Sequence, residues 1–475
     1  MKLFSKRVTA FIAAFLLAFT SLWAFAGGNL SADTLQDDPN DGIITANERK
    51  TDLLNEQLED APNVRAASYI LYDATSGTIL LGKDYNVQKE PASMTKVMTI
   101  LLALERLNET ETVTITKEMS DAIKKIDRDY VKLGLQEGEE ISVKDLIYAA
   151  VLKSANDASL ALGMYMAGTE ADFCELMNSR AADIGCTGTH FCSAYGVSSP
   201  DNVTTPLDMA LILNEAVTTT KYSEIAKTLN YTISATNKYS SERELTNANR
   251  FVSTTNYGYE YYVGGKTGFT DSAGYTLCAA AKKNNRTLVG CVFNAADSDV
   301  RYADLIKLFE YGYTSFTTVE ITENEFTPLV DETHKQISEL LADTNLYLSE
   351  QRLVLDPFIT TTSYRAQLGS SNRIDLSKAV IDTSAETQTL ELPLCKVYSD
   401  KTYLIGTLVV TIEKKAGVVE VNPEKLTNLT NVKSILVTFA VLSGLILLLV
   451  IVLLIFRARV IKHRREEATK RANML

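Results

Sequence analysis

Three short motifs carry side chains that can perform nucleophilic catalysis, and they follow one another in a defined order. Ser93-Met94-Thr95-Lys96 opens a predicted helix, Ser154-Ala155-Asn156 interrupts a helical stretch, and Lys266-Thr267-Gly268 lies in a predicted strand. A helix cap, a turn and a strand end explain each motif taken singly. The three together, in this order, are specific and indicate a serine nucleophile assisted by lysines.

The spacing of the first motif gives the physical reason for this interpretation. A serine hydroxyl is a poor nucleophile near neutral pH and needs a base within hydrogen-bond reach. Residues three apart share a helix face, so Lys96 can reach the hydroxyl of Ser93. A lysine becomes a base when burial or a second cation lowers its pKa, and Lys266 can supply that cation. Ser93 near a helix N-terminus also exposes backbone N–H groups to a developing oxyanion.

At these motifs the sequence resembles the serine DD-peptidases of the penicillin-binding protein class, in particular the low-molecular-mass D-alanyl-D-alanine carboxypeptidases. The resemblance extends over about residues 66–312 and includes residues 90–96, 144–158 and 265–270. It implies an α/β (α+β) fold of the transpeptidase type shared with serine β-lactamases, in which helices flank an antiparallel sheet. A small β-rich C-terminal domain and a membrane-attached C-terminus also fit the layout of that family.

The resemblance implies a catalytic role for three residues and a binding role for a fourth. Ser93 is the expected acylated nucleophile and Lys96 its general base. Ser154 is expected to relay a proton to the departing D-alanine, and Asn156 to hold the amide of the substrate.

The same resemblance implies a binding role for the third motif. Lys266 and Thr267 are expected to bind the terminal carboxylate of the substrate. Gly268, the next residue of the motif, is also expected to belong to the substrate-binding site. The N–H groups of Ser93 and Phe269 are the expected oxyanion hole. Arg301 matches a family arginine that favours the same carboxylate, and a plain surface arginine explains it nearly as well.

One stretch departs from the family pattern. The family often has His or Asn before Gly-Leu after the long helix, whereas this chain has Tyr195-Gly196-Val197, with Val203 where a later His would stand. His190 is interpreted as a structural residue. The departure concerns the fine specificity for substrate and leaves the reaction unaffected.

Hydrophobic periodicity supports the implied architecture. Two short apolar runs at 66–72 and 78–81 predict a hairpin, and residues 275–281 and 286–293 predict another around Asn284-Asn285. Helices are predicted at 93–107, 143–167 with a break near Lys153-Ser154, 171–184, 205–217 and 299–312. The expected domains are a catalytic domain at 63–317 and a β-rich domain at 318–420, with a linker at 421–433.

The two ends of the chain have the composition of export and membrane segments. Residues 1–26 have a basic start, an apolar run and small residues before position 27, which predicts a signal peptide, with an uncleaved anchor as the alternative. Residues 27–62 are polar and acidic and predict a flexible arm. Residues 434–456 carry no charge and are long enough to span a bilayer, although a buried core helix is the alternative. The basic tail at 457–475 predicts a single-pass protein with a cytoplasmic C-terminus and an extracytoplasmic catalytic domain in a bacterial cell membrane.

Charge excludes one class of partner. The first seven residues contribute +3 and the last 19 contribute +5 to a net charge of −12, so residues 27–433 carry −20. A nucleic-acid partner is excluded, because phosphate binding needs a basic surface.

Six cysteines allow 15 pairings, and we favour free, buried thiols for Cys278 and Cys291, which the hairpin places opposite one another. No CxxC motif or clustered His/Cys spacing indicates a metal site, and three histidines in the chain disfavour a histidine-based one. No metal and no cofactor are therefore expected.

The function that the resemblance implies is removal of the terminal D-alanine from peptidoglycan stem peptides ending in D-Ala-D-Ala, with β-lactams as covalent inhibitors. Endopeptidase action on cross-links shares this chemistry and stays open. A β-lactam or wall-fragment sensor without turnover is disfavoured, because a pure receptor needs neither Lys96 nor Ser154. A β-lactamase needs a group that speeds deacylation, and the sequence shows none.

Overall fold

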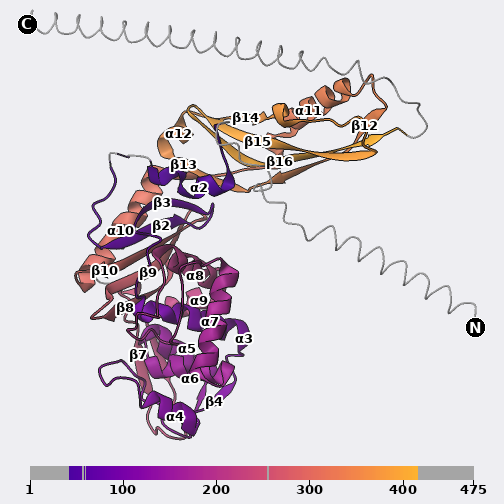
Figure 1. Ribbon diagram of the computed structural model, residues 1–475. Helices are drawn as coiled ribbons and strands as arrows, with labels where there is room; N and C mark the ends of the chain where they lie inside the picture. Colours follow the sequence, from indigo (N-terminus) through magenta and orange to yellow (C-terminus); the bar gives the residue numbers. More distant parts are fainter. Residues whose placement is uncertain (1–41, 56–57, 59, 254–255, 416–475) are drawn as a thin grey trace, which may run out of the picture. The chain divides into compact units, whose positions relative to one another are not determined.

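The computed structural model describes residues 42–55, 58, 60–253 and 256–415 (Figure 1). The described residues divide into two compact units, the first within residues 42–334, 351–379 and 390–410, and the second within 335–350, 380–389 and 411–415. The predicted signal peptide (1–26), linker (421–433), membrane span (434–456) and basic tail (457–475) lie outside the described residues. Among the residues described, no helix is long and apolar enough to cross a membrane.

The first unit contains a five-stranded sheet that is antiparallel throughout, as predicted. Its spatial order is β3-β2-β10-β9-β8, with the bounds β2 (Ser68–Asp73), β3 (Thr78–Lys83), β8 (Tyr262–Thr270), β9 (Gly274–Lys283) and β10 (Arg286–Ala295). Asn284 and Asn285 both have positive φ, which suits the two-residue turn between β9 and β10. Cys278 lies opposite Cys291 in this hairpin, and both thiols are free and buried, as favoured from the sequence.

Helices pack against both faces of this sheet (Figure 1). α10 (Ser298–Ser315) covers one face, where Gly290 of β10 permits close approach, because a Cβ there would lie 2.6 Å from Cδ2 of Leu305. On the other face α8 (Pro206–Thr218) contacts β2, β9 and β10, and with its neighbours it encloses the larger apolar core. The neighbouring helices are α3 (Lys96–Arg106), α4 (Lys117–Ile123), α5 (Val143–Leu152), α6 (Asn156–Ala167), α7 (Glu170–Ile184) and α9 (Thr220–Ala226).

The helix ends follow local sequence signals. Thr205 caps α8 by accepting from the N–H of Asp208, and Pro206 occupies the first position of that helix. Gly185 ends α7 in the left-handed conformation, as predicted. The predicted break in residues 143–167 separates α5 from α6, and Ser154 there has φ of +60°. This turn places the second motif at the start of α6.

Short strand pairs extend the helical part of the first unit. The sequence reasoning did not identify β4 (Thr112–Thr114) with β5 (Glu140–Ser142), or β6 (Asn230–Ile233) with β7 (Arg243–Thr246). Each strand has only three or four residues, so hydrophobic alternation is too brief to distinguish it from a loop.

The C-terminal region is rich in strands, as expected, and also contains helices. One sheet has the order β1-β16-β15-β14 with β12 paired to β16, and a separate ribbon pairs β11 with β13. The strands are β1 (Ile43–Ile44), β11 (Phe316–Glu320), β12 (Leu346–Leu355), β13 (Phe358–Thr362), β14 (Ser371–Ile374), β15 (Thr387–Tyr398) and β16 (Lys401–Lys414). The helices are α11 (Thr327–Leu340) and α12 (Ser363–Gln367).

The described part of residues 27–62, expected to be a flexible arm, is folded instead. It contains β1, which pairs in parallel with β16, and α2 (Ala46–Asp52). Thr45 and Glu48 form a capping box that starts α2, and Leu53 after the helix is buried. The acidic composition hid a local helix signal and a strand whose partner lies near the other end of the described chain.

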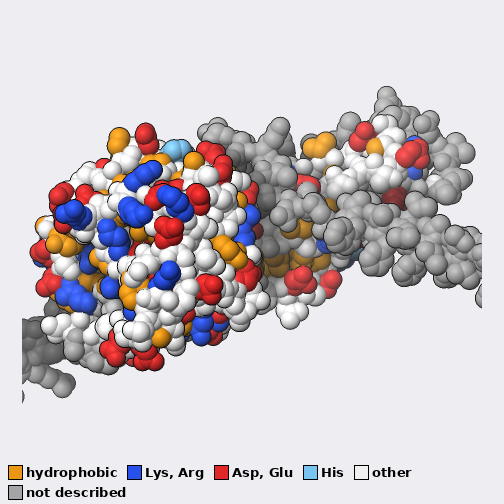
Figure 2. All heavy atoms as spheres, turned by 90° about the horizontal axis from the view of Figure 1, so that it is seen from below, with side chains coloured by type: hydrophobic (Ala, Val, Ile, Leu, Met, Phe, Trp, Pro, Cys, Tyr) orange, Lys and Arg blue, Asp and Glu red, His pale blue; other side chains and the backbone are white. Residues whose placement is uncertain are grey.

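Polar side chains form hydrogen bonds and ion pairs within each unit. In the second unit the hydroxyl of Tyr347 donates to Glu413, and Lys414 pairs with Glu386. In the first unit Asp73 is fully buried and pairs with Arg286 at 2.7 Å. Figure 2 shows acidic and basic side chains interspersed on the face that it displays.

Candidate active site

The predicted nucleophile and base lie side by side at the start of α3. Ser93 belongs to a 3-10 turn, η3 (Ala92–Thr95), and Lys96 is the first residue of α3. Nζ of Lys96 is 2.8 Å from Oγ of Ser93. Lys96 is fully buried, whereas Ser93 is half-buried and reachable. The first motif therefore has the contact that its spacing predicts.

Two further oxygen atoms surround the amine of Lys96. Nζ donates to Oδ1 of Asn156 at 2.7 Å and to the backbone carbonyl of Tyr195 at 2.7 Å. Both are acceptors only, so a neutral amine spends its two N–H bonds on them. Its lone pair is then left for the third neighbour, the hydroxyl of Ser93. The geometry orients a neutral lysine as the acceptor of the serine proton.

The electrostatics favour that neutral form. Burial lowers the pKa of Lys96 well below its ordinary value, and the nearby cation of Lys266 lowers it further. The carboxylate of Asp157 acts in the opposite direction and raises the pKa. Desolvation is the largest of these effects, so Lys96 is equipped to act as a base.

The second and third motifs meet through their serine and lysine. Nζ of Lys266 lies 2.9 Å from Oγ of Ser154 and 2.9 Å from the carbonyl of Thr267. Burial lowers the pKa of Lys266 to about 7, with Cys278 raising it and Arg301 lowering it. The amine of Lys266 can therefore gain or lose a proton near neutral pH. It is hydrogen-bonded to the hydroxyl of Ser154, which is predicted to relay protons.

The glycine of the third motif lets strand β8 approach the nucleophile. A Cβ on Gly268 would lie 2.9 Å from the backbone N of Ser93 and 2.4 Å from Oγ1 of Thr276. Only a residue without a side chain fits between these atoms. Phe269 follows directly, so the two N–H groups predicted to form the oxyanion hole belong to adjoining segments. Its ring is half exposed and packs against Tyr275, with the ring centroids 4.5 Å apart.

Arg301 lies beneath the third motif, bonded to its main chain. Its guanidinium donates to the carbonyl of Gly268 at 3.0 Å and to that of Thr276 at 3.2 Å. Only 9% of the residue is exposed, and the guanidinium lies 5.4 Å from the ring centroid of Tyr275. It is therefore not the surface arginine of the alternative interpretation. Any effect of Arg301 on a bound carboxylate acts through its charge and through its hold on Gly268.

Asn156 joins the base to a neighbouring loop. Its Nδ2 and its backbone N both donate to the carbonyl of Val131, at 2.9 Å each. Its Oδ1 accepts a hydrogen bond from Nζ of Lys96, so both the oxygen and the nitrogen of the amide already have protein partners. The second N–H of Nδ2 is the group that remains for the substrate amide of the predicted role.

The structure thus brings Ser93, Lys96 and Asn156 into one set of contacts. Ser154 and Lys266 form a second set, and the charge of Lys266 acts on Lys96. Sequence reasoning missed the carbonyl of Tyr195, which binds Lys96, and the buried carboxylate of Asp157, whose charge raises the pKa of Lys96. A backbone carbonyl has no side-chain signature that a motif search can use. The departure from the family pattern at Tyr195-Gly196 was a pointer to this segment.

His190 lies outside the contacts made by the three motifs. Its Nδ1 is bonded to the carbonyl of Asp201 at 2.7 Å, and its backbone pairs with Val203. This agrees with the structural role predicted for it.

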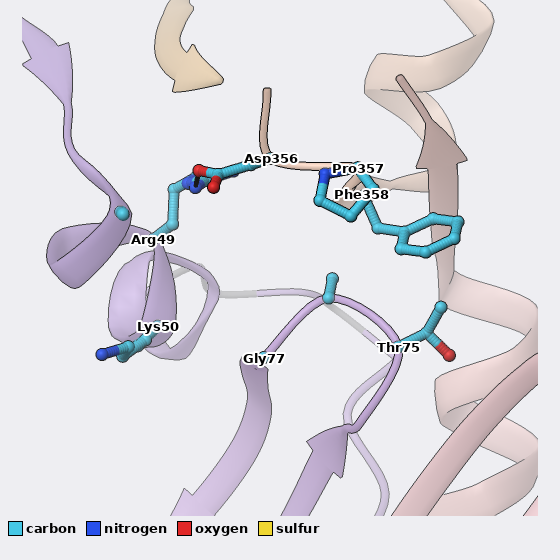
Figure 3. Close-up of a pocket in the computed structure, with 9 residues that line it drawn as sticks. Arg49, Lys50, Thr75, Gly77, Asp356, Pro357 and Phe358 are labelled. Carbon is cyan, nitrogen blue, oxygen red and sulfur yellow. Dashed lines mark hydrogen bonds and ion pairs between the residues drawn. The ribbon is translucent and has the colours of Figure 1, made fainter. Parts of the chain in front are cut away.

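A separate hollow of about 180 Å³ lies elsewhere in the first unit (Figure 3). Arg49 points toward Asp356 and pairs with it, and Thr75, Pro357 and Phe358 are among the other residues that line the hollow. None of the residues that line it belongs to the three motifs. The hollow is therefore distinct from the candidate active site.

Comparisons with known proteins agree with this geometry. The sequence profile of a family described as D-alanyl-D-alanine carboxypeptidase matches residues 55–297. The chain is 31% identical over 276 residues to the D-alanyl-D-alanine carboxypeptidase DacC of Escherichia coli, covering 56% of this chain and 65% of that one. It is 31% identical over 261 residues to DacF of Bacillus subtilis, covering 53% and 63%.

A third relative is shorter, and a solved structure of a DD-transpeptidase from Streptomyces K15 is also similar. The D-alanyl-D-alanine carboxypeptidase of Streptomyces strain K15 is 30% identical over 263 residues, covering 53% of this chain and 88% of that one. A single-residue variant of the Streptomyces K15 DD-transpeptidase superposes with a TM-score of 0.50 at 28% identity, covering 53% of this chain and 99% of that one. The match thus falls on the part of this chain that contains all three motifs, and it spans less than two thirds of the length of the E. coli and B. subtilis relatives. The chain belongs to the D-alanyl-D-alanine carboxypeptidase family of serine peptidases.

Proposed function

We propose that this protein is a serine-type D-alanyl-D-alanine carboxypeptidase that trims the terminal D-alanine of peptidoglycan stem peptides. The observation that carries the proposal is the placement of Nζ of a fully buried lysine, Lys96, 2.8 Å from the hydroxyl of Ser93. The second pair, Lys266 and Ser154, supplies a cation and a hydroxyl whose atoms lie 2.9 Å apart. Family membership supports the same reaction class.

The acylation step follows from these contacts. Oγ of Ser93 attacks the carbonyl of the penultimate D-alanine while its proton passes to neutral Lys96. The N–H groups of Ser93 and Phe269 stabilise the oxyanion of the tetrahedral intermediate. Ser154 relays this proton from Lys96 to the nitrogen of the departing D-alanine, and the peptide C–N bond breaks to leave an ester on Ser93 and a neutral Lys96.

Deacylation returns the enzyme to its starting state. Water attacks the ester carbonyl and gives a proton to neutral Lys96, and the ester C–O bond to Ser93 breaks. Lys96 returns this proton to Oγ of Ser93. The shortened peptide then leaves as a carboxylate after losing its acid proton to the solvent. Protonated Lys266 with Thr267 holds the terminal carboxylate of the incoming substrate, as the sequence reasoning predicts.

The test is mass spectrometry of the intact chain after incubation with a penicillin and with a D-Ala-D-Ala peptide. We expect a penicilloyl adduct on Ser93, release of D-alanine from the peptide, and loss of both in Ser93→Ala. Ser377→Ala is a matched control, because the hydroxyl of Ser377 bonds to Asp375 in the β-rich region. An adduct on another serine would overturn the assignment.

A paired time course separates carboxypeptidase from β-lactamase action. A penicilloyl group keeps its leaving group tethered, which shields the ester from water, whereas D-alanine departs and opens the site. We expect an adduct that persists for minutes or longer, beside repeated turnover of the peptide. Sustained penicillin hydrolysis faster than peptide hydrolysis would reverse the choice, and transfer of the acyl group to added amines would indicate a transpeptidase.

We also propose that residues 434–456 anchor the protein in a bacterial cell membrane with the catalytic domain outside. The absence of charge over this run and the basic residues after it support the proposal. The full chain should sediment with membranes, and a truncated chain of residues 42–415 should be released and active. The truncation begins at 42 because β1 pairs with β16. Release of the full chain without detergent would contradict the anchor.

A further inference from the structure

A buried carboxylate that none of the three motifs includes lies directly after Asn156. Asp157 is fully buried, and four backbone N–H groups donate to it. Oδ1 accepts from Leu133 at 2.8 Å and from Ala158 at 2.9 Å, while Oδ2 accepts from Gly134 at 2.7 Å and from Leu135 at 3.1 Å. The carboxylate thereby fixes the loop at 133–135 to the first turn of α6.

The loop held in this way is the one that orients Asn156. The carbonyl of Val131, two residues before Leu133, accepts from both the backbone N and Nδ2 of Asn156. Oδ1 of Asn156 then accepts from Nζ of Lys96. A continuous set of hydrogen bonds and two short backbone segments therefore links Asp157 to the general base.

Asp157 also brings negative charge to the site. A buried anion is poorly screened, so it acts on Lys96 without direct contact. The other titratable groups that face Lys96 are Lys266 on β8 and Tyr195 on the loop before Gly196, whose ring centroid is 6.0 Å from Nζ. Asp157 raises the pKa of Lys96 and so opposes the effects of burial and of Lys266.

We propose that Asp157 is a positioning residue for the acylation of Ser93, which holds Asn156 against Lys96 through the 131–135 loop and balances the charge of Lys266. The inference rests on the proposed function of this site. It assigns Asp157 no contact with substrate. Its influence passes through the orientation and the protonation of Lys96.

The test variant is Asp157→Asn in the full chain, because asparagine keeps the volume but removes the charge. Its amide NH₂ also cannot accept hydrogen bonds from the loop. The second-order rate of penicilloylation of Ser93 is measured by mass spectrometry across pH. We expect the plateau to fall by about 10-fold to 100-fold, as for a displaced catalytic group. In the plot of this rate against pH, the acid limb is the range over which the rate falls as Lys96 becomes protonated. This limb should move to lower pH by about one unit, because Lys96 without the anion stays neutral in more acidic solution.

Asp304 offers a matched control. Its carboxylate is fully buried on α10 and accepts from the backbone N–H groups of Arg65 and Ala66 at 2.8 and 2.9 Å. Asp304→Asn removes the same kind of buried anion from another part of the fold. We expect it to lower the melting temperature without moving the acid limb of acylation.

Asp157→Glu keeps the charge and lengthens the side chain, and it decides the matter if Asp157→Asn does not fold. An acid limb at the wild-type position with a lowered plateau supports the proposal, and a displaced limb in this variant overturns it. An unchanged acid limb in folded Asp157→Asn also overturns it. If wild-type Ser93 is never acylated, the proposed function fails, which is a distinct result.

Discussion

The substitution Gly196→Ala tests whether the loop that binds Lys96 must lie against the nucleophile. Gly196 has φ of +88°, and a Cβ there would lie 1.9 Å from the carbonyl oxygen of Ala92 and 2.9 Å from Oγ1 of Thr95. Ala92 immediately precedes Ser93. The preceding carbonyl, that of Tyr195, accepts from Lys96, so any displacement of Gly196 reaches the base directly.

The size of the effect follows from these distances. Real Cβ atoms essentially never come closer than 3.0 Å to another heavy atom, so the 1.9 Å contact requires a shift of about 1.1 Å. Because backbone atoms form the contact, no side-chain rotation relieves it. The left-handed conformation costs a non-glycine residue about 1–2 kcal/mol, and accommodating the added atom about 1–3 kcal/mol more. We expect the free energy of unfolding to fall by about 2–5 kcal/mol, and a displacement of 1 Å in the site to slow acylation by about 100-fold.

Urea unfolding and the rate of penicilloylation measure the two effects separately. Gly185→Ala is the matched control, since Gly185 has φ of +92° and nothing lies within 4 Å of its added Cβ. It should lose only the conformational part, about 1–2 kcal/mol, and acylate at the wild-type rate. Equal behaviour of the two variants would refute the reasoning, because it would show that the contact with Ala92 has no consequence.

Three further predictions concern the lysines and the buried ion pair. The pKa of about 7 that burial gives Lys266 predicts a basic limb near pH 7 in kcat/KM for a D-Ala-D-Ala peptide, because the carboxylate-binding cation is lost as the pH rises through that value. Lys266→Arg keeps the charge and should move the limb to higher pH in a D-alanine release assay. Lys96→Ala should slow acylation by at least about 100-fold, and a wild-type rate by mass spectrometry would exclude it as the base. Asp73→Ala leaves Arg286 buried without its carboxylate and should lower the free energy of unfolding in urea by about 3–5 kcal/mol, whereas a change below 1 kcal/mol would contradict the pairing.

Local spacing was enough to predict the core of the site. Ser93 and Lys96 are three residues apart at a helix start, and that geometry alone brings the two side chains together. The break between α5 and α6 was predictable because Ser154 interrupts the helical repeat of apolar residues at 143–167. Lys266 was predicted from its motif as the second cation, but its contact with Ser154 depends on tertiary packing that no local pattern encodes.

Other features depend on long-range pairing or on backbone atoms, which leave little trace in a single sequence. The carbonyl of Tyr195 accepts from Lys96 although the side chain at that position differs from the family pattern. The position of Arg301 in its helix was predictable, whereas its bonds to the carbonyls of Gly268 and Thr276 were not. The folding of residues 42–55 escaped prediction because the pairing of β1 with β16 joins segments far apart in the sequence.

That pairing sets an order of events during folding. Ile43 and Ile44 emerge early from the ribosome, but their partners Thr402 and Tyr403 are made only after nearly the whole described chain. Closing so long a loop is entropically costly and slows the step that forms it. The N-terminal strand must therefore wait unpaired while the catalytic sheet folds, and an exported chain would complete this sheet only after almost all of it had crossed the membrane.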